Sequence, residues 1–140
     1  MVVVSACLAG VECRYNGQAF PIPRVIEMVK KGQAIPLCPE ILGDLPIPRL
    51  SAEQCGGRIF AKDGQDLTNE YVAGAKIALN IAQLVGCKKA ILKSKSPACG
   101  CGVIYDGTFS GKLTQGDGFF CKLLKDQNVK VFTEDEMTSL

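Results

Sequence analysis

Four short apolar runs, separated by longer segments with helical spacing, constrain the fold of this chain more than any other feature of its sequence. The runs are Met1–Ala6, Ala34–Leu37, Ala90–Leu92 and Val129–Phe132. Short, continuously apolar runs are typical of strands that are buried on both faces of a sheet. We therefore expect these runs to form the central strands of the protein.

Between these runs lie segments whose apolar residues recur at the spacing of a helix face. The longest, Asn69–Val85, is preceded by Thr68, a residue type that caps helix N-termini, and is closed by Gly86. The other helices are expected over Pro23–Val29, over Phe119–Lys125, and after a capping box formed by Thr133 and Glu136.

The alternation of buried strands and helices predicts an α/β fold. We expect a three-layer, Rossmann-like arrangement in which helices cover both faces of a mostly parallel sheet of about four strands. The length of 140 residues suits a single domain over residues 1–140. Two passages rich in Gly or Pro, 39–57 and 100–118, show no helical period and are expected to be loops. The first is long for a loop without regular structure, which indicates a functional role.

The charge and hydropathy of the chain narrow its partners. A net charge of +2, from 16 basic and 14 acidic side chains, is too small for a protein that binds nucleic acid through bulk charge. No apolar run reaches the length of a membrane span, and the first residues lack the basic and apolar regions of a secretory signal. We expect a soluble, cytoplasmic protein.

The chain has eight cysteines and no histidine. The lack of histidine excludes His-ligated zinc centres, Cys-His nucleophile pairs and Ser-His-Asp triads. The cytoplasm keeps thiols reduced, and a chain with 47% apolar residues can form a core without disulfides. These cysteines are therefore expected to be apolar core residues or parts of a metal or catalytic site.

Three of the cysteines follow expected strands. Cys7 and Cys38 come directly after the first and second runs, and Cys99 lies in the loop after the third. Because parallel strands end at the same edge of a sheet, these three thiols can converge on one point. Such a group favours a soft metal, either zinc or an iron–sulfur cluster with one open iron, although cysteines at strand ends are also common as buried apolar residues.

The other cysteines have less defined roles. Cys13 and Cys101 each lie a few residues from one of the three, so each is a fourth ligand, a redox partner or a bystander. Core or surface thiols are expected at Cys55, Cys87 and Cys121.

Several motifs, in order along nearly the whole chain, resemble the short-form thiouracil desulfidase family. They are SACLAG at 5–10, CRYNG at 13–17, CPE at 38–40, PR at 48–49, KSKSPACG at 93–100 and YDGTF at 105–109. The resemblance implies a 4Fe-4S cluster held by Cys7, Cys38 and Cys99, with the fourth iron open to bind the sulfur of a thiolated substrate. The chain departs from the family at Asn16, where Asp is usual, and at Gly43-Asp44, where a Gly-Gly pair is common; we expect both changes to affect the choice of substrate.

The implied reaction replaces sulfur with oxygen from water and involves no net redox step. Glu40, two residues beyond Cys38, is the candidate base that deprotonates water, and Ser96 is a candidate for binding the substrate or passing a proton. The alternatives are a solvated or capping carboxylate for Glu40 and a simple turn residue for Ser96. Arg14 and Arg49 can orient a polar heterocycle or lie on the surface.

Two other functions fit the same cysteines. One is a non-catalytic metal-binding or sulfur-trafficking module. The other is a thiol oxidoreductase that works through Cys7 and Cys13 or through Cys99 and Cys101.

Overall fold

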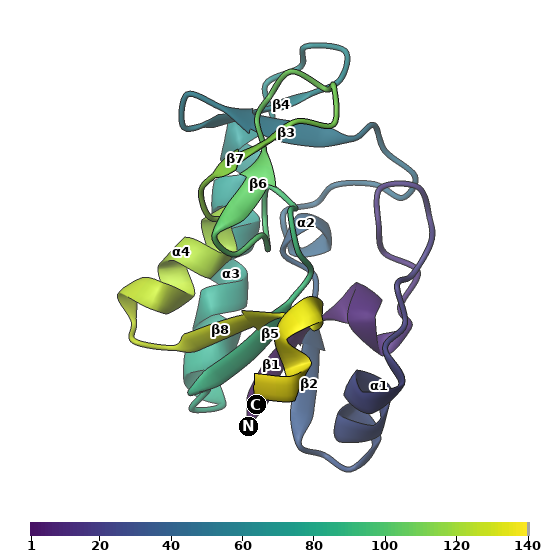
Figure 1. Ribbon diagram of the computed structural model, residues 1–140, viewed down its shortest axis with the longest axis vertical. Coiled ribbons are helices and arrows are strands. Elements are labelled where there is room, and N and C mark those ends of the chain that lie inside the picture. Colours follow the sequence, from purple (N-terminus) through teal and green to yellow (C-terminus); the bar gives the residue numbers. More distant parts are fainter. Residues whose placement is uncertain (140) are drawn as a thin grey trace.

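The computed structural model describes residues 1–139 and has a four-stranded parallel sheet at its centre (Figure 1). The strand order is β2-β1-β5-β8. The strands are β1 (Val2–Ser5), β2 (Ala34–Leu37), β5 (Lys89–Leu92) and β8 (Lys130–Thr133). In the register, Val3 lies opposite Ile35 of β2 on one side and Ala90 of β5 on the other. The predicted parallel sheet of about four strands is therefore confirmed.

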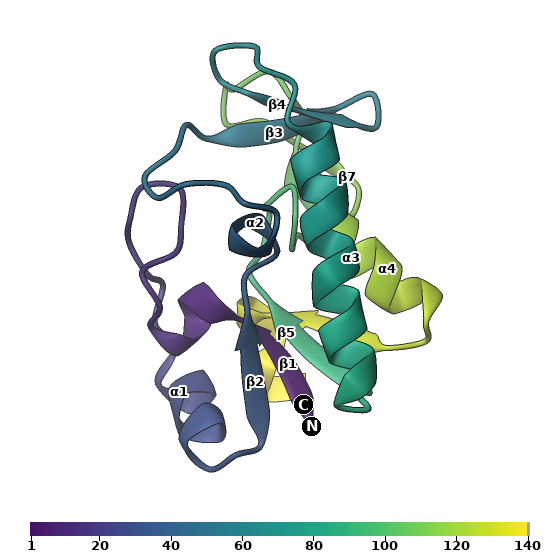
Figure 2. The same ribbon diagram turned by 180° about the vertical axis from the view of Figure 1, so that it is seen from behind.

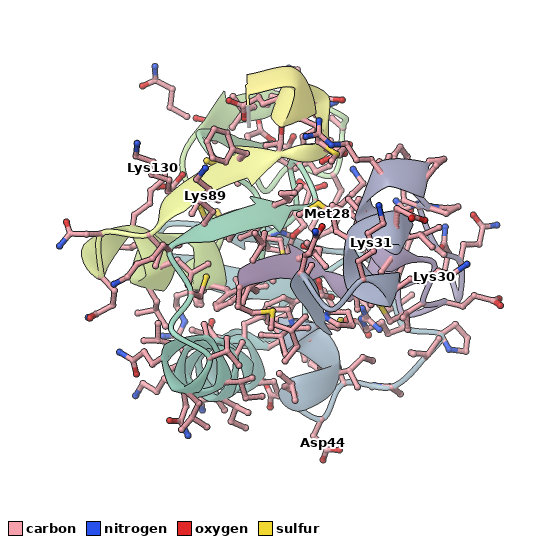
Figure 3. The ribbon with its side chains drawn as sticks, turned by 90° about the horizontal axis from the view of Figure 1, so that it is seen from below. Met28, Lys30, Lys31, Asp44, Lys89 and Lys130 are labelled. Atoms are coloured by element: carbon pink, nitrogen blue, oxygen red, sulfur yellow. The ribbon has the colours of Figure 1, made fainter. Side chains whose placement is uncertain are left out.

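Helices cover both faces of this sheet. Figure 3 shows α3 (Thr68–Leu84) and α4 (Phe119–Asp126) on one side, and α1 (Pro23–Lys30) with the 3₁₀ helix η2 (Glu134–Ser139) on the other. Successive side chains of a strand point to opposite faces. Val3 accordingly packs in the core beneath α3 and α4, while Val4 packs in the core beneath α1. The three-layer α/β fold is confirmed, and it explains why the strands are apolar on both faces.

The bounds of the helices agree with those predicted from the sequence to within one residue at each end, but one predicted helix cap is wrong. Thr68 is the first residue of α3, and Leu67 takes the cap position without a side-chain hydrogen bond. The buried Thr68 hydroxyl instead accepts a hydrogen bond from the Ile59 N–H at 2.9 Å, which ties the helix to the neighbouring hairpin. At the C-terminal segment, the Thr133 N–H donates to Glu136 Oε1 at 3.1 Å, as the capping box predicts, although the helix is of the 3₁₀ type.

The two passages expected to be loops contain regular structure, so that expectation is wrong in part. Passage 39–57 holds the short helix α2 (Pro39–Leu42) and the strand β3 (Ala52–Cys55), which pairs with β4 (Arg58–Ala61) in an antiparallel hairpin. Gly56 and Gly57 both have positive φ and form the tight turn between these strands. In passage 100–118, a second hairpin joins β6 (Val103–Tyr105) to β7 (Leu113–Gln115).

The carboxyl ends of β1 and β2 face the end of the molecule that carries the β3–β4 hairpin (Figure 2). From β1 the chain passes to β2 on one side and then returns to β5 on the other. This reversal is a topological switch point, where open α/β sheets form a crevice outside the strand ends. The 3₁₀ helix η1 (Ala6–Ala9) begins directly after β1 at this edge. Among the helices that the structure describes, none is long and apolar enough to span a membrane.

Candidate functional site

A pocket of about 330 Å³ opens at the switch point, between the loops that follow β1, β2 and β5. Residues of β3 and β6 also line it, so the hairpins form one wall of the pocket. The structure brings together in this pocket all the site residues expected from the sequence. These are Cys7, Cys38, Cys99, Glu40 and Ser96. Cys13 lines the same pocket, whereas Cys101 does not.

Each thiol of the pocket comes from a different element. Cys7 lies in η1, Cys38 precedes α2 at its cap position, and Cys99 lies in the loop after β5. Cys7 and Cys99 are only 6% and 5% exposed, and Cys38 is half-buried. The Ser5 Oγ accepts a hydrogen bond from the Lys93 N–H, at the start of the loop after β5, at 2.9 Å. The end of β1 thereby holds the loop that carries Cys99.

The pocket favours negative charge on one sulfur. A hydrogen bond from the Cys13 thiol lowers the pKa of Cys38 to about 7, helped by the Ile41 N–H and opposed by burial. Burial and the neighbouring Cys38 raise the pKa of Cys7 to about 11. Burial also raises the pKa of Cys99 well above its ordinary value. Of these three thiols, Cys38 is therefore the one that ionises near neutral pH, and the other two need a nearby cation such as a metal to do so.

The spacing of the pocket thiols argues against a single metal ion. A zinc ion with Zn–S bonds of about 2.3 Å holds its sulfur ligands roughly 4 Å apart. Among residues 1–139, the one set of three cysteine or carboxylate groups whose ligand atoms all lie within 4.8 Å of one another is Cys101, Asp117 and Cys121, outside the pocket. The Sγ atoms of Cys7, Cys38 and Cys99 do not form such a set, so at least one pair of them lies more than 4.8 Å apart. Three soft donors that do not all fit around one ion are compatible with a group of several metal atoms, such as an iron–sulfur cluster.

Glu40 is held in the pocket by one of its two oxygens. Its Oε1 accepts hydrogen bonds from Arg49 Nε at 3.1 Å and from the Tyr71 hydroxyl at 2.8 Å, and Arg49 Nη2 lies 3.0 Å away in an ion pair. Its Oε2 makes no hydrogen bond with any residue that the structure describes. The carboxylate is thus fixed at one oxygen, while the other is available to a ligand. This geometry excludes the solvated carboxylate and the helix cap as roles for Glu40.

Arg49 and Tyr71 are the residues that sequence reasoning missed or left open. The Arg49 side chain is 7% exposed in its ion pair, so it does not lie on the surface, and it also donates to the Cys13 carbonyl at 2.9 Å. Tyr71 had the spacing of a core residue of α3, and no local signal marks its hydroxyl as a partner of Glu40. Burial, followed by the charge of Glu40, raises the pKa of Tyr71, so the phenol remains a donor.

Ser96 shapes the loop that carries Cys99. Its Oγ accepts the Cys99 N–H at 2.6 Å, which is the turn role that the sequence allows for a serine before proline. Because this bond uses a lone pair of the oxygen, the hydroxyl proton is still available to a ligand in the pocket. The turn role and a ligand-binding role are therefore compatible.

Comparison with known proteins places the chain among sulfur-removing enzymes. A model of the 2-thiouracil desulfurase family matches residues 2–136. The uncharacterized protein YbbK of Bacillus subtilis (strain 168) is 39% identical over 150 residues, with 100% of this chain and 99% of that protein covered. A solved structure of the [4Fe-4S]-dependent thiouracil desulfidase TudS superposes with a TM-score of 0.94 at 38% identity, covering 99% of this chain and 93% of that one.

Proposed function

This chain belongs to the 2-thiouracil desulfurase family and is therefore a desulfidase, and on that premise we propose that it replaces the sulfur of a thiolated pyrimidine with oxygen from water. The observation that carries the proposal is the meeting of three thiols and an anchored carboxylate in one pocket. The net reaction converts a thiocarbonyl and water into a carbonyl and hydrogen sulfide, with no change in oxidation state.

Cys7, Cys38 and Cys99 are the residues that we propose hold a 4Fe-4S cluster. The solved relative is [4Fe-4S]-dependent, and the donor set here consists of three soft sulfur groups that line one pocket. With three protein ligands, a cluster supplies an open iron as a Lewis acid for a soft thiocarbonyl sulfur.

Glu40 performs the proton transfer in this proposal. Its unbonded Oε2 accepts a proton from the water that attacks the thiocarbonyl carbon, while Arg49 and Tyr71 fix Oε1 and so set the direction of the carboxylate. The conjugate acid then returns this proton to the sulfur. Glu40 next accepts the remaining hydroxyl proton as the carbonyl forms and hydrosulfide leaves, and release of that proton completes the net formation of hydrogen sulfide. The Ser96 hydroxyl donates a hydrogen bond to the bound ring. A pocket of about 330 Å³ suits a small heterocycle.

Sulfide release by the iron-loaded protein tests the function. The protein is purified and reconstituted without oxygen, and uracil and sulfide are quantified after incubation with 2-thiouracil. We expect equal amounts of both products. Cys38→Ser is expected to lose both bound iron and activity, while Cys55→Ser, which changes an exposed thiol outside the pocket, keeps both.

Two results contradict the proposal. The first is a fully iron-loaded protein that releases no sulfide from any member of a panel of thiopyrimidines. The second is a Cys38→Ser variant with the iron content and rate of the unmodified protein.

A further inference from the structure

A second set of metal-ligating side chains lies outside the pocket. The Sγ atoms of Cys101 and Cys121 and a carboxylate oxygen of Asp117 all lie within 4.8 Å of one another. Cys101 follows the Cys99 loop, Asp117 precedes α4, and Cys121 lies in the first turn of α4. None of the three lines the pocket, so this set is separate from the proposed active site.

The set is sheltered from solvent and rich in groups that can carry negative charge. Cys121 is 0% exposed, and Cys101 is half-buried. The Asp117 side chain is 25% exposed and accepts hydrogen bonds from the Gly102 N–H at 2.7 Å and from Lys125 Nζ at 3.0 Å. Lys125 is the cation beside this carboxylate, and its own side chain is 41% exposed. It can therefore swing into solvent when another cation takes its place.

The chemistry and spacing of these donors point to one class of ligand. Two sulfurs and one carboxylate oxygen are the donors that zinc takes in proteins, and a fourth, tetrahedral position can be filled by water. The mutual distances suit a single ion, in contrast to the wider set of thiols in the pocket. We propose that Cys101, Asp117 and Cys121 bind one thiophilic divalent cation of the zinc type.

The position of this site gives the cation a structural role. The N-terminus of α4 is already joined to the Cys99 loop, because the N–H groups of Phe119 and Phe120 donate to the carbonyls of Pro97 and Ala98 at 3.0 and 2.9 Å. A side chain at Gly118 would overlap the Ala98 carbonyl, so the two backbones are in direct contact. A bound cation adds a cross-link between Cys101 and α4, which stiffens the loop that presents Cys99.

The experiment measures zinc on the complete, cluster-loaded protein. Anaerobically prepared protein is incubated with one equivalent of Zn²⁺ and desalted, and zinc is quantified by mass spectrometry. X-ray absorption at the zinc edge then identifies the ligands, and the iron of a cluster does not interfere. We expect about one zinc per chain, with two sulfur ligands near 2.3 Å and lighter ligands completing the site.

Matched variants connect the zinc to these residues. Cys121→Ser is expected to lose the zinc, and Asp117→Asn, which keeps the shape of the side chain, to bind it at least about tenfold more weakly. Lys125→Met removes the competing cation and is expected to strengthen binding severalfold. Cys55→Ser is the control and retains the zinc. For the unmodified protein and Cys55→Ser, but not for Asp117→Asn, zinc is expected to raise the thermal unfolding midpoint.

Three results of the zinc measurements would overturn the proposal. They are a desalted protein without zinc, zinc retained equally by Asp117→Asn and Cys121→Ser, or a shell of three or four sulfurs, which places the ion on the pocket thiols. A Cys101–Cys121 disulfide in the anaerobically prepared protein, detected by peptide mass spectrometry, also contradicts it. Because Asp117→Asn changes no thiol and no buried volume, its result stands even where Cys121→Ser folds poorly.

Discussion

The hydrogen bonds of Glu40 are concentrated on a single oxygen. Arg49 and Tyr71 both bind Oε1, and this arrangement fixes the carboxylate without occupying Oε2. Burial raises the pKa of Tyr71, so its phenol stays protonated and keeps donating to this oxygen.

Replacing Glu40 tests its role directly. In Glu40→Gln the side chain keeps its shape but cannot accept a proton from water, so we expect the rate of sulfide release to fall by about 10²- to 10⁴-fold. The iron content and its absorption spectrum should not change. Glu27→Gln, on the exposed face of α1, serves as the control and should retain the full rate. A Glu40→Gln enzyme with an undiminished rate contradicts the assignment.

Tyr71 should act only through Glu40. Removing its hydroxyl in Tyr71→Phe frees the carboxylate to rotate, and we expect roughly a tenfold loss of rate, smaller than the loss in Glu40→Gln. In a double-mutant cycle, Tyr71→Phe should have almost no effect when Glu40 is already Gln. Equal losses in both backgrounds would show that Tyr71 acts independently of Glu40.

At the scale of single residues, the sequence predicted the residues that line the pocket, but it did not predict which residues hold them in place. Cys38 and Glu40 follow a recognisable strand, and their place at its end puts them at the switch point. Tyr71 lies far from both in sequence, at a position whose spacing already explains it as core. Its hydroxyl reaches Glu40 only because α3 crosses α2, and such a contact between distant elements leaves no local pattern.

At the scale of elements, the close contact of α2 with α3 positions the segment that begins with Cys38. Gly74 of α3 lies against the carbonyl of Pro39, and Gly43 lies against the backbone of Glu70. Only glycine permits this approach, because a Cβ at either position would overlap main-chain atoms. The packing fixes α2, and with it Cys38 and Glu40, against the longest helix.

Gly74→Ala is therefore expected to destabilise the protein. In an ordinary helix interior this change stabilises by about 0.5–1 kcal/mol, but here it forces α2 away from α3 and should cost about 1–3 kcal/mol. Urea unfolding measures the difference, and the rate of sulfide release should fall as well. Asn80→Ala, on the exposed face of the same helix, is the matched control. A stabilised Gly74→Ala variant would refute this account of the contact.

The connection between η2 and the loop after β5 should be sensitive to acid. Burial opposes ionisation of Glu134, but hydrogen bonds from Lys93 Nζ and the Ser94 N–H, both 2.8 Å long, hold its pKa below the ordinary value. A lowered pKa stabilises the fold above the ordinary pKa of a glutamate, and this contribution is lost as the pH falls through the folded-state value.

Glu134→Gln is accordingly expected to lower the free energy of unfolding by about 1–3 kcal/mol at neutral pH. The difference from the unmodified protein should shrink as the pH falls below the ordinary pKa of a glutamate, because the carboxylate of the unmodified protein then also becomes protonated. Urea titrations at neutral and at acidic pH measure it. Asp126→Asn, at an exposed position, is the control and should change stability by less than about 0.5 kcal/mol. A difference that is independent of pH contradicts the ionic role of Glu134.

The strands and helices of the central layers were predictable because their burial leaves a periodic apolar pattern. The hairpins were not, since β3 carries the polar residues Glu53 and Gln54 at positions that are sheltered in the fold. Glu53 is only 8% exposed, and its Oε1 accepts the N–H groups of Gly107 and Phe109 at 3.0 and 3.1 Å. Because a distant loop provides the hydrogen bonds of this buried carboxylate, a charged residue stands at a buried position of the strand. The alternation of apolar and polar residues that marks a strand is therefore lost. The helix α2 has only four residues, too few to show a helical period.

Across the whole molecule, the pocket joins three loops that are far apart in sequence. A cluster bound to Cys7, Cys38 and Cys99 would cross-link the ends of β1, β2 and β5, and any group that binds only the folded state stabilises it. Removing the iron with a chelator should therefore lower the thermal unfolding midpoint. Hydrogen exchange should become faster in these loops and remain unchanged in α1. Identical unfolding midpoints with and without iron would contradict this ligand set.

The division of the pocket between strand-end loops and hairpins has an evolutionary consequence. The three pocket thiols follow the ends of strands of the central sheet, whereas Glu53 and Tyr105 line the pocket from the two hairpins. Insertions or substitutions in these two hairpins are expected to change which heterocycle binds, without changing the proposed ligands of the cluster. Relatives that keep the same three thiols are therefore expected to differ in the sulfur compounds that they accept.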